Sequence, residues 1–239
     1  MQLSADFEAM LQTSHLLCSC FSFVGSVCWS STTSYPTGTD SCREKIHTAV
    51  WFLSNQEVFR SVRNLFGFGN KGSAHHAIME VLKAIDTLKD KYIQSPKMEK
   101  CMELANSFEQ ISGFPNVIGA IDGTHIPNKP PANDRESYIN RKGLPSVNVM
   151  AVCDNKKKFT AVFANRAGSV HDARVLRVTP LSCPLEQASE FHVLGDSAYP
   201  LLPQLMVPYK DNGHLTPAQR KYNSCLSSTR GDRASFWAS

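Results

Sequence analysis

The chain has 239 residues, 42% of them hydrophobic and 19% charged, with a formal net charge of +4. This balance predicts a globular protein with a sizeable core and excludes a disordered chain. No apolar run reaches the roughly 20 residues of a membrane-spanning helix. The eight cysteines form no C-x-x-C pairs, which excludes a zinc ribbon and a small disulfide scaffold.

Residues 1–42 carry few structural signals. Ser, Thr and Cys are frequent, no charged residue falls between Glu8 and Asp40, and no helical period appears. Asp6 and Glu8 stand where a signal peptide would be basic, so we expect a cytosolic or nuclear protein. We treat this segment as a tail.

Residues 43–115 show a helical period. The apolar spacing predicts one amphipathic helix around residues 46–53 and a second over 56–66 that ends at Gly67. A third helix is predicted to begin with Ser73 as its N-cap, because serine accepts hydrogen bonds from the first backbone amides of a helix.

A helix, a short glycine turn and a second helix have the spacing of a helix-turn-helix. In this interpretation the third helix is the recognition helix, and Lys71 and His75 near its start are candidate DNA contacts. Three short amphipathic helices also pack into ordinary bundles, and that alternative stays open. A metal pair at His75 and His76 is disfavoured because neighbouring residues point about 100° apart on a helix.

After Pro115 the period changes to two or to continuous apolar runs, which indicates strands. The predicted strands cover residues 117–122, 147–153, 159–164 and 191–195. Residues 154–158 (D-N-K-K-K) predict a hairpin turn whose lysines lie in solvent. A helix is expected from about Val170 to Val178, where Pro180 ends it.

Two of these strands end on an acid. Asp122 follows the apolar run of N-V-I-G-A-I-D-G-T-H, and Asp196 follows that of F-H-V-L-G-D-S. A carboxylate at the end of a buried strand is costly unless it is paired or holds a metal, and two of them in one sheet can converge on one divalent ion. Alternatively, each Asp caps a turn.

The charge is unevenly distributed. Residues 1–115 hold 10 Lys and Arg against 11 Asp and Glu, whereas residues 116–239 hold 15 against 10. The second half therefore carries a net charge of +5, which favours a phosphate-binding surface there.

Six motifs follow one another: V-I-G-A-I-D-G-T-H (117–125), S-Y-I-N-R-K-G (137–143), N-V-M-A-V-C-D (148–154), G-S-V-H-D-A-R-V-L (168–176), L-G-D-S-A-Y-P-L-L-P (194–203) and P-Y-K-D-N-G-H-L-T-P-A-Q-R-K-Y-N (208–223). In this order and spacing the chain resembles Harbinger-type transposases and the nucleases derived from them, over residues 51–230. The resemblance implies an α/β, RNase-H-like mixed sheet and a DDE triad that binds Mg²⁺ or Mn²⁺, with Asp122 and Asp196 as its first two acids. It also implies a DNA substrate, a Myb-like DNA-binding partner protein and a nuclear location.

The third acid of the triad has no match in this chain. In the family, S-S-T-R continues as a helix of the type V-I-E-R-A-F-G-R, whose Glu completes the triad, but here G-D-R-A-S-F-W-A-S follows. One back-translation of residues 231–239, read one base later, gives V-I-E-R-A-F-G-R. We therefore interpret this segment as a frame-shifted reading of the catalytic helix, and we expect no replacement of the missing Glu by Asp232.

These considerations divide the chain into a tail (1–42), a helical, helix-turn-helix-like domain (43–115) and a DDE nuclease or transposase domain (116–239). The last domain is expected to be C-terminally truncated and to lack its last catalytic helix.

Further residues are candidates for the site. Asp172, at a predicted helix start, is either an N-cap or a fourth acid near the metal. His125 and His171 flank acids and can orient water or phosphate, and Arg141 and Lys142 can contact a nucleic-acid backbone. Each of these four is equally compatible with an ordinary surface position in a loop.

The expected chemistry is cleavage of phosphodiester bonds through two divalent ions held between carboxylates. With the third acid absent, the chain as given is expected to be nearly inactive. Three interpretations stay open: a metal-dependent DNA nuclease or transposase, a catalytically dead DNA- or partner-binding derivative, and a decayed transposon fragment.

Overall fold

The computed structural model describes residues 42–55, 58–177 and 190–235. The chain forms two compact units, Met1–Tyr92 and Ile93–Ser239. The predicted tail falls almost entirely on residues 1–41, and the expected helix end at Val178 and Pro180 on residues 178–189, so both lie outside the described residues. In the part that is described, no helix combines the length and the apolar character that crossing a membrane requires.

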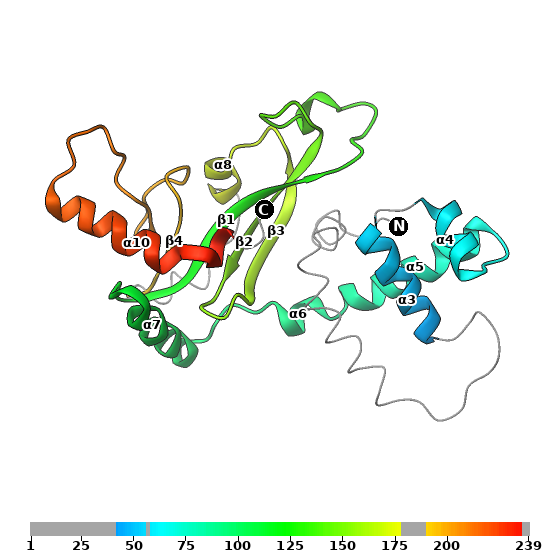
Figure 1. The fold of residues 1–239 in the computed structure, drawn as a ribbon, viewed down its shortest axis with the longest axis horizontal. Helices are drawn as coiled ribbons and strands as arrows, with labels where there is room; N and C mark the ends of the chain where they lie inside the picture. Colours follow the sequence, from blue (N-terminus) through cyan, green and yellow to red (C-terminus); the bar gives the residue numbers. More distant parts are fainter. Residues whose placement is uncertain (1–41, 56–57, 178–189, 236–239) are drawn as a thin grey trace. The chain divides into compact units, whose positions relative to one another are not determined.

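The first unit is helical (Figure 1). Its helices are α3 (Cys42–Asn55), α4 (Phe59–Phe66), α5 (Lys71–Asp86) and α6 (Lys89–Tyr92). Both α3 and α4 pack against α5, through a core that includes Leu53, Val62 and Ile78. The predicted end of α4 at Gly67 is confirmed: this residue takes a φ of 69°, a left-handed conformation that glycine adopts without strain.

The predicted N-cap of α5 is wrong by one turn. Asn70, with an extended backbone, is the N-cap, and its side chain accepts a hydrogen bond of 2.8 Å from the amide of Ser73. Asn and Ser are both favoured N-caps, so composition alone does not separate them. Ser73 is instead the third residue of the helix.

The second unit is built on a five-stranded mixed sheet (Figure 1). The strands are β1 (Val117–Pro127), β2 (Ser146–Cys153), β3 (Phe159–Ala167), β4 (His192–Leu194) and β5 (Leu205–Met206), in the order β3-β2-β1-β4-β5. The neighbours β1, β2 and β3 pair antiparallel, whereas β4 is parallel to both β1 and β5. This is the expected RNase-H-like arrangement; β1 is longer than predicted, and β5 was not predicted.

Helices complete this unit. They are α7 (Met98–Ser112), the short 3-10 helix η1 (Glu136–Tyr138), α8 (Asp172–Arg177) and α10 (Pro217–Ser235). The expected domain boundary at 115/116 differs from the structure, because α7 belongs to the sheet unit. Its buried side chains, among them Leu104 and Phe108, join the two core clusters of the sheet.

The strand β4 is covered on both faces. Val193 belongs to a cluster with Leu104 of α7 and Val175 of α8, whereas the next residue, Leu194, belongs to a cluster with Phe108 of α7 and Leu226 of α10. Successive strand residues point to opposite faces, so apolar layers lie on both sides of β4. The backbone that leads to Asp196 is therefore held in the core.

A helix, α10, leads up to the place where the sequence departs from the expected catalytic helix, and the loss of that helix stays a prediction. α10 packs on α7 and β1 and remains regular up to Arg230. At Gly231, with φ 34° and ψ −142°, the helical backbone is interrupted. The side chain of Asp232 lies outside the described residues, so the expectation about this residue stays a prediction.

Candidate functional site

Asp122 lies in β1, and Asp196 follows the end of β4, the strand that pairs parallel with β1. Ala120 of β1 is the register partner of Leu194 of β4. Asp122 lies two residues beyond Ala120 within β1 and shares its face, and Asp196 lies two residues beyond Leu194, just past the end of β4. Because Leu194 packs with Leu226 of α10, this is the face that α10 covers. The register therefore agrees with the predicted convergence of the two acids, which stays a prediction.

Asp122 has a polar environment. Its Oδ1 atom accepts a hydrogen bond of 3.0 Å from the amide of Gly123 and lies 3.1 Å from Nη2 of Arg230. The Asp122 side chain is 15% exposed and that of Arg230 is 22% exposed. The first acid is therefore paired with a cation from α10.

Asp196 opens a tight turn. Its Oδ1 atom accepts a hydrogen bond of 3.0 Å from the amide of Ala198, and its carbonyl oxygen accepts one of 3.3 Å from the amide of Tyr199. The chain is tightly packed just before this turn: a Cβ atom on Gly195 would lie 3.1 Å from both Leu205 and Tyr199. Turn capping and a metal-ligand role, the two alternatives for this Asp, are thus compatible.

The donor set fits a hard divalent cation. Two part-buried carboxylates supply the oxygen ligands that Mg²⁺ and Mn²⁺ prefer, and such ions retain several waters when few protein ligands are present. Within residues 42–55, 58–177 and 190–235 no group of three or more His, Cys, Asp or Glu side chains is arranged to hold a metal. The two-ion arrangement that the resemblance implies stays a prediction.

The histidine candidates fall in two different places. His125 accompanies Ser146, with Nδ1 3.2 Å from the serine Oγ atom, and strand alternation puts it on the face opposite Asp122. His171 is instead hydrogen-bonded to the guanidinium of Arg141. The structure therefore separates His125 from the two acids.

The predicted backbone contacts Arg141 and Lys142 lie in a tight turn. The Asn140 side chain accepts hydrogen bonds of 2.9 Å from the amide of Lys142 and 3.1 Å from the amide of Leu144. Both basic residues are exposed. The turn and the Arg141–His171 contact bring three basic side chains from two motifs into one surface cluster.

Asp172 is the first residue of α8, and its side chain lies outside the described residues. The two roles considered for it, N-cap and fourth acid, therefore stay predictions.

The other predicted DNA contacts belong to the helical unit. Lys71 is the exposed first residue of α5, and the His75 ring lies edge-on to that of Phe59 with centroids 5.0 Å apart. This ring contact gives His75 a packing role that its sequence position did not reveal.

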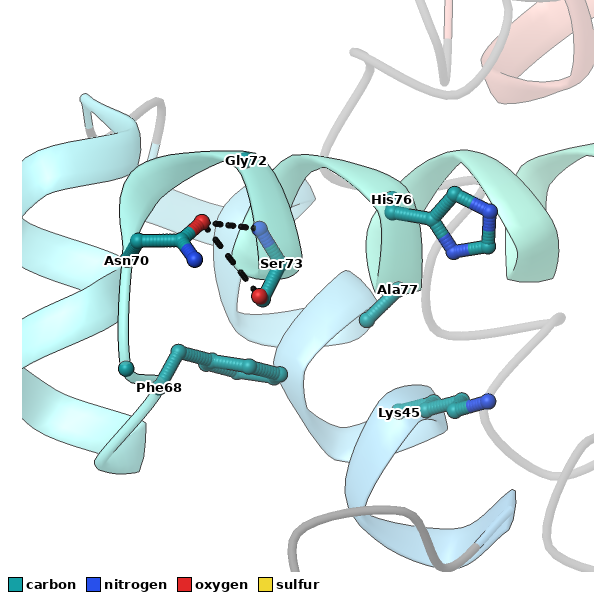
Figure 2. A pocket seen from close by; sticks show the side chains of 8 residues that line it. Lys45, Phe68, Asn70, Gly72, Ser73, His76 and Ala77 are labelled. Atoms are coloured by element: carbon teal, nitrogen blue, oxygen red, sulfur yellow. Dashed lines mark hydrogen bonds between the residues drawn. The ribbon is translucent and has the colours of Figure 1, made fainter.

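A cavity of about 530 Å³ opens beside the start of α5 (Figure 2). It is lined by Lys45, Phe68, Gly69, Asn70, Gly72, Ser73, His76 and Ala77. Lys45 lies 3.0 Å from Glu80, and its hydrogen bond and charge lower the pKa of the Glu80 carboxyl. Figure 2 shows the side-chain oxygen of Asn70 facing the backbone amide and the hydroxyl of Ser73. These two polar residues of the helix cap therefore line one side of the cavity.

Arg230 is the residue of the site that sequence reasoning missed. It stands in S-S-T-R, immediately before the segment where the sequence departs from the expected helix. The sequence signal that could have indicated Arg230 is its place in S-S-T-R, next to the position of the catalytic helix in the family. Its pairing with Asp122 depends on how α10 docks on β1, which the helical pattern alone does not specify.

Comparison with known proteins gives a family for this site. Residues 121–232 match the family described as DDE superfamily endonuclease. The chain is 33% identical to the human protein named "Putative nuclease HARBI1" over 165 residues, which cover 67% of this chain and 46% of that protein. It is 29% identical to the Xenopus laevis protein of the same name over 190 residues (77% and 53%), and 28% identical to Arabidopsis thaliana "Protein ALP1-like" over 200 residues (77% and 48%). The chain spans about half the length of these relatives, and no solved structure matches it.

Proposed function

Since the chain carries a DDE superfamily endonuclease domain and is homologous to nucleases derived from Harbinger transposases, we propose that it acts on DNA phosphodiester bonds at Asp122 and Asp196 with a divalent metal. The observation that supports this proposal is the Ala120–Leu194 register, because it pairs the two strand segments that lead to Asp122 and Asp196. Hydrolysis adds the oxygen of water to phosphorus and releases one ester oxygen as a hydroxyl.

The two acids have related roles. Each would supply a carboxylate oxygen to a Mg²⁺ or Mn²⁺ ion, and the amides of Gly123 and Ala198 orient these carboxylates through hydrogen bonds to Oδ1. When bound, such an ion supplies charge stabilisation to a phosphate under attack. The apolar layers on both faces of β4 limit the movement of the strand that leads to Asp196.

The substrate surface is proposed to include the basic cluster of Arg141, Lys142 and His171. The first two are exposed, and cationic side chains on a surface bind phosphates without reading sequence. We propose in addition that the helical unit contacts DNA through Lys71 and His75, that a Myb-like protein supplies sequence recognition, and that the protein acts in the nucleus. These three statements rest on the family resemblance.

A metal titration tests the site first. Asp122→Asn and Asp196→Asn should each weaken Mn²⁺ binding measured by calorimetry, because each substitution removes a charged ligand. Glu99→Gln, on the exposed surface of α7, is the matched control that removes one negative charge elsewhere. Unchanged Mn²⁺ affinity in both aspartate variants would contradict the metal site.

A cleavage assay tests the activity. The chain as given is compared with a protein in which residues 231–238 are replaced by V-I-E-R-A-F-G-R, on the same duplex and with Mg²⁺. Cleavage should be stronger in the replaced form and should be lost in its Asp122→Asn variant, since two acids hold an ion less firmly than three. Equal cleavage by the two forms would show that the third carboxylate is not needed here.

A non-catalytic role in binding DNA or a partner is the second candidate function. It is favoured by the departure of residues 231–239 from the expected catalytic helix and by the cation that pairs with Asp122. Duplex binding without cleavage, in the replaced form as well, would support this candidate over the nuclease. Absence of both activities would instead favour a decayed transposon fragment.

A further inference from the structure

The contact between α10 and Asp122 leads to an inference about metal binding. This inference goes beyond the proposed function and rests on it. Arg230 reaches Asp122 from the last regular turn of α10, with Nη2 and Oδ1 3.1 Å apart. Both side chains are largely buried, so water screens this pair less than a surface ion pair. We propose that Arg230 takes the place of a divalent cation at Asp122 in the metal-free protein, and that metal binding requires this ion pair to open.

The like charge beside Asp122 explains why a cation is needed there. Asp196 follows the end of β4, the parallel neighbour of β1, two residues beyond Leu194, which pairs with Ala120. Two neighbouring carboxylates repel each other, and each favours a counter-ion. A guanidinium and a divalent ion satisfy the same electrostatic requirement, so they compete for Asp122.

The pair is poorly built as a structural anchor. The Nε atom of Arg230 is buried and has no hydrogen-bond partner in the described part of the chain. A buried donor left without a partner is unfavourable, which an ion pair selected for stability would avoid. The Arg230–Asp122 ion pair is therefore suited to open when a metal binds.

The docking of α10 has other supports. Leu226 is buried in the core, the Tyr222 hydroxyl donates a hydrogen bond of 3.2 Å to the Val207 carbonyl, and Ser112 of α7 contacts both Thr229 and the Cys225 carbonyl. Helix position therefore does not depend on Arg230. Its side chain can leave Asp122 while α10 stays in place.

The test is a Mn²⁺ titration of the whole chain by calorimetry. Arg230→Gln should bind Mn²⁺ about tenfold more tightly than the parent chain, because the ion no longer has to displace a cation from a partly buried site. Lys221→Gln is the matched control: it removes one positive charge from the exposed side of the same helix and should leave the affinity within about twofold.

Thermal unfolding gives a second measurement. In EDTA, Arg230→Gln should melt at a lower temperature than the parent, because two neighbouring carboxylates are left without their cation. Addition of Mn²⁺ should then raise its melting temperature by more than it raises that of the parent. An equal Mn²⁺ shift in both proteins would overturn the proposal.

Several outcomes separate this proposal from the proposed function. If Mn²⁺ binding requires Asp122 but Arg230→Gln leaves the affinity unchanged or weakens it, only the role of Arg230 is overturned. An equal gain in Mn²⁺ affinity in Arg230→Gln and Lys221→Gln would have the same meaning. Mn²⁺ binding that does not require Asp122 would overturn the metal site itself. Should Arg230→Gln fail to fold, Arg230→Lys provides the same titration: a smaller gain in affinity supports the proposal and no gain overturns it.

Discussion

The side-chain amide of Asn148 donates a hydrogen bond of 3.0 Å to the carbonyl oxygen of Val170. This bond joins β2, the neighbour of the central strand β1, to the loop that carries His171. Asn148 is 1% exposed, so the bond is formed in the core and away from competing water. It couples the position of the basic cluster to the sheet that holds the two acids.

Asn148→Ala should lower the free energy of unfolding by about 1–3 kcal/mol, because the Val170 carbonyl loses its buried donor. Chemical denaturation measures this change. Asn106→Ala, at an exposed position of α7, is the control and should change stability by less than about 0.5 kcal/mol. Equal effects of the two substitutions would contradict a linking role for Asn148.

Leu226→Ala should lower the free energy of unfolding by about 2–5 kcal/mol, because it removes a core side chain that is 1% exposed and joins α10 to β4. The comparison is Leu201→Ala, a position that is 67% exposed, which should be nearly neutral. A neutral Leu226→Ala in urea denaturation would show that α10 does not dock on the sheet as described.

Duplex DNA binding should weaken steeply between about 50 and 200 mM salt if the basic half of the chain meets phosphates. The double substitution of Arg141 and Lys142 by Gln should lower the slope of log affinity against log salt by about one for each phosphate that is no longer neutralised. Lys156→Gln, at the exposed hairpin tip, should leave the slope unchanged. Fluorescence anisotropy at several salt concentrations separates these cases, and an unchanged slope in the double variant would exclude the turn as a phosphate-binding element.

His192 predicts a pH dependence of stability. Burial lowers the pKa of its imidazole below the ordinary value of 6.5, so the folded protein binds this proton less readily than the unfolded chain. The stability contribution is therefore full above about pH 6.5 and declines as the pH falls toward the folded-state pKa. His192→Gln should flatten this decline, whereas His214→Gln, at an exposed position, should not. Denaturation curves across this pH range that match the parent in both variants would contradict the effect.

The strands and the two acids could be predicted from the sequence because the signals are local. The apolar runs before Asp122 and Asp196 mark strands, but β1 continues past Asp122 to Pro127, so the predicted strand end at this acid was wrong. Three features could not be predicted in this way: the two-residue pairing of β5, the assignment of α7 to the sheet unit, and the Arg230–Asp122 pair. All three depend on contacts between residues far apart in the chain, which periodicity does not record.

The start of α5 also shows where prediction from local sequence fails. The glycine turn and the helix after it were recognisable from Gly67 and the apolar period that follows, but the capping residue was assigned to Ser73 instead of Asn70. Both residue types cap helices well, and only the backbone angles distinguish them. The packing of His75 against Phe59 likewise depends on how two helices meet.

The place of α7 has a consequence for how this protein can be divided. A gene fusion or exon junction at residue 116 would separate the sheet from Leu104 and Phe108, which belong to its two apolar layers. The sheet would then expose the apolar side chains that these two residues cover. A junction between Tyr92 and Ile93 leaves both layers intact. The smallest portable piece that carries Asp122 and Asp196 therefore begins before α7, well upstream of the first acidic motif.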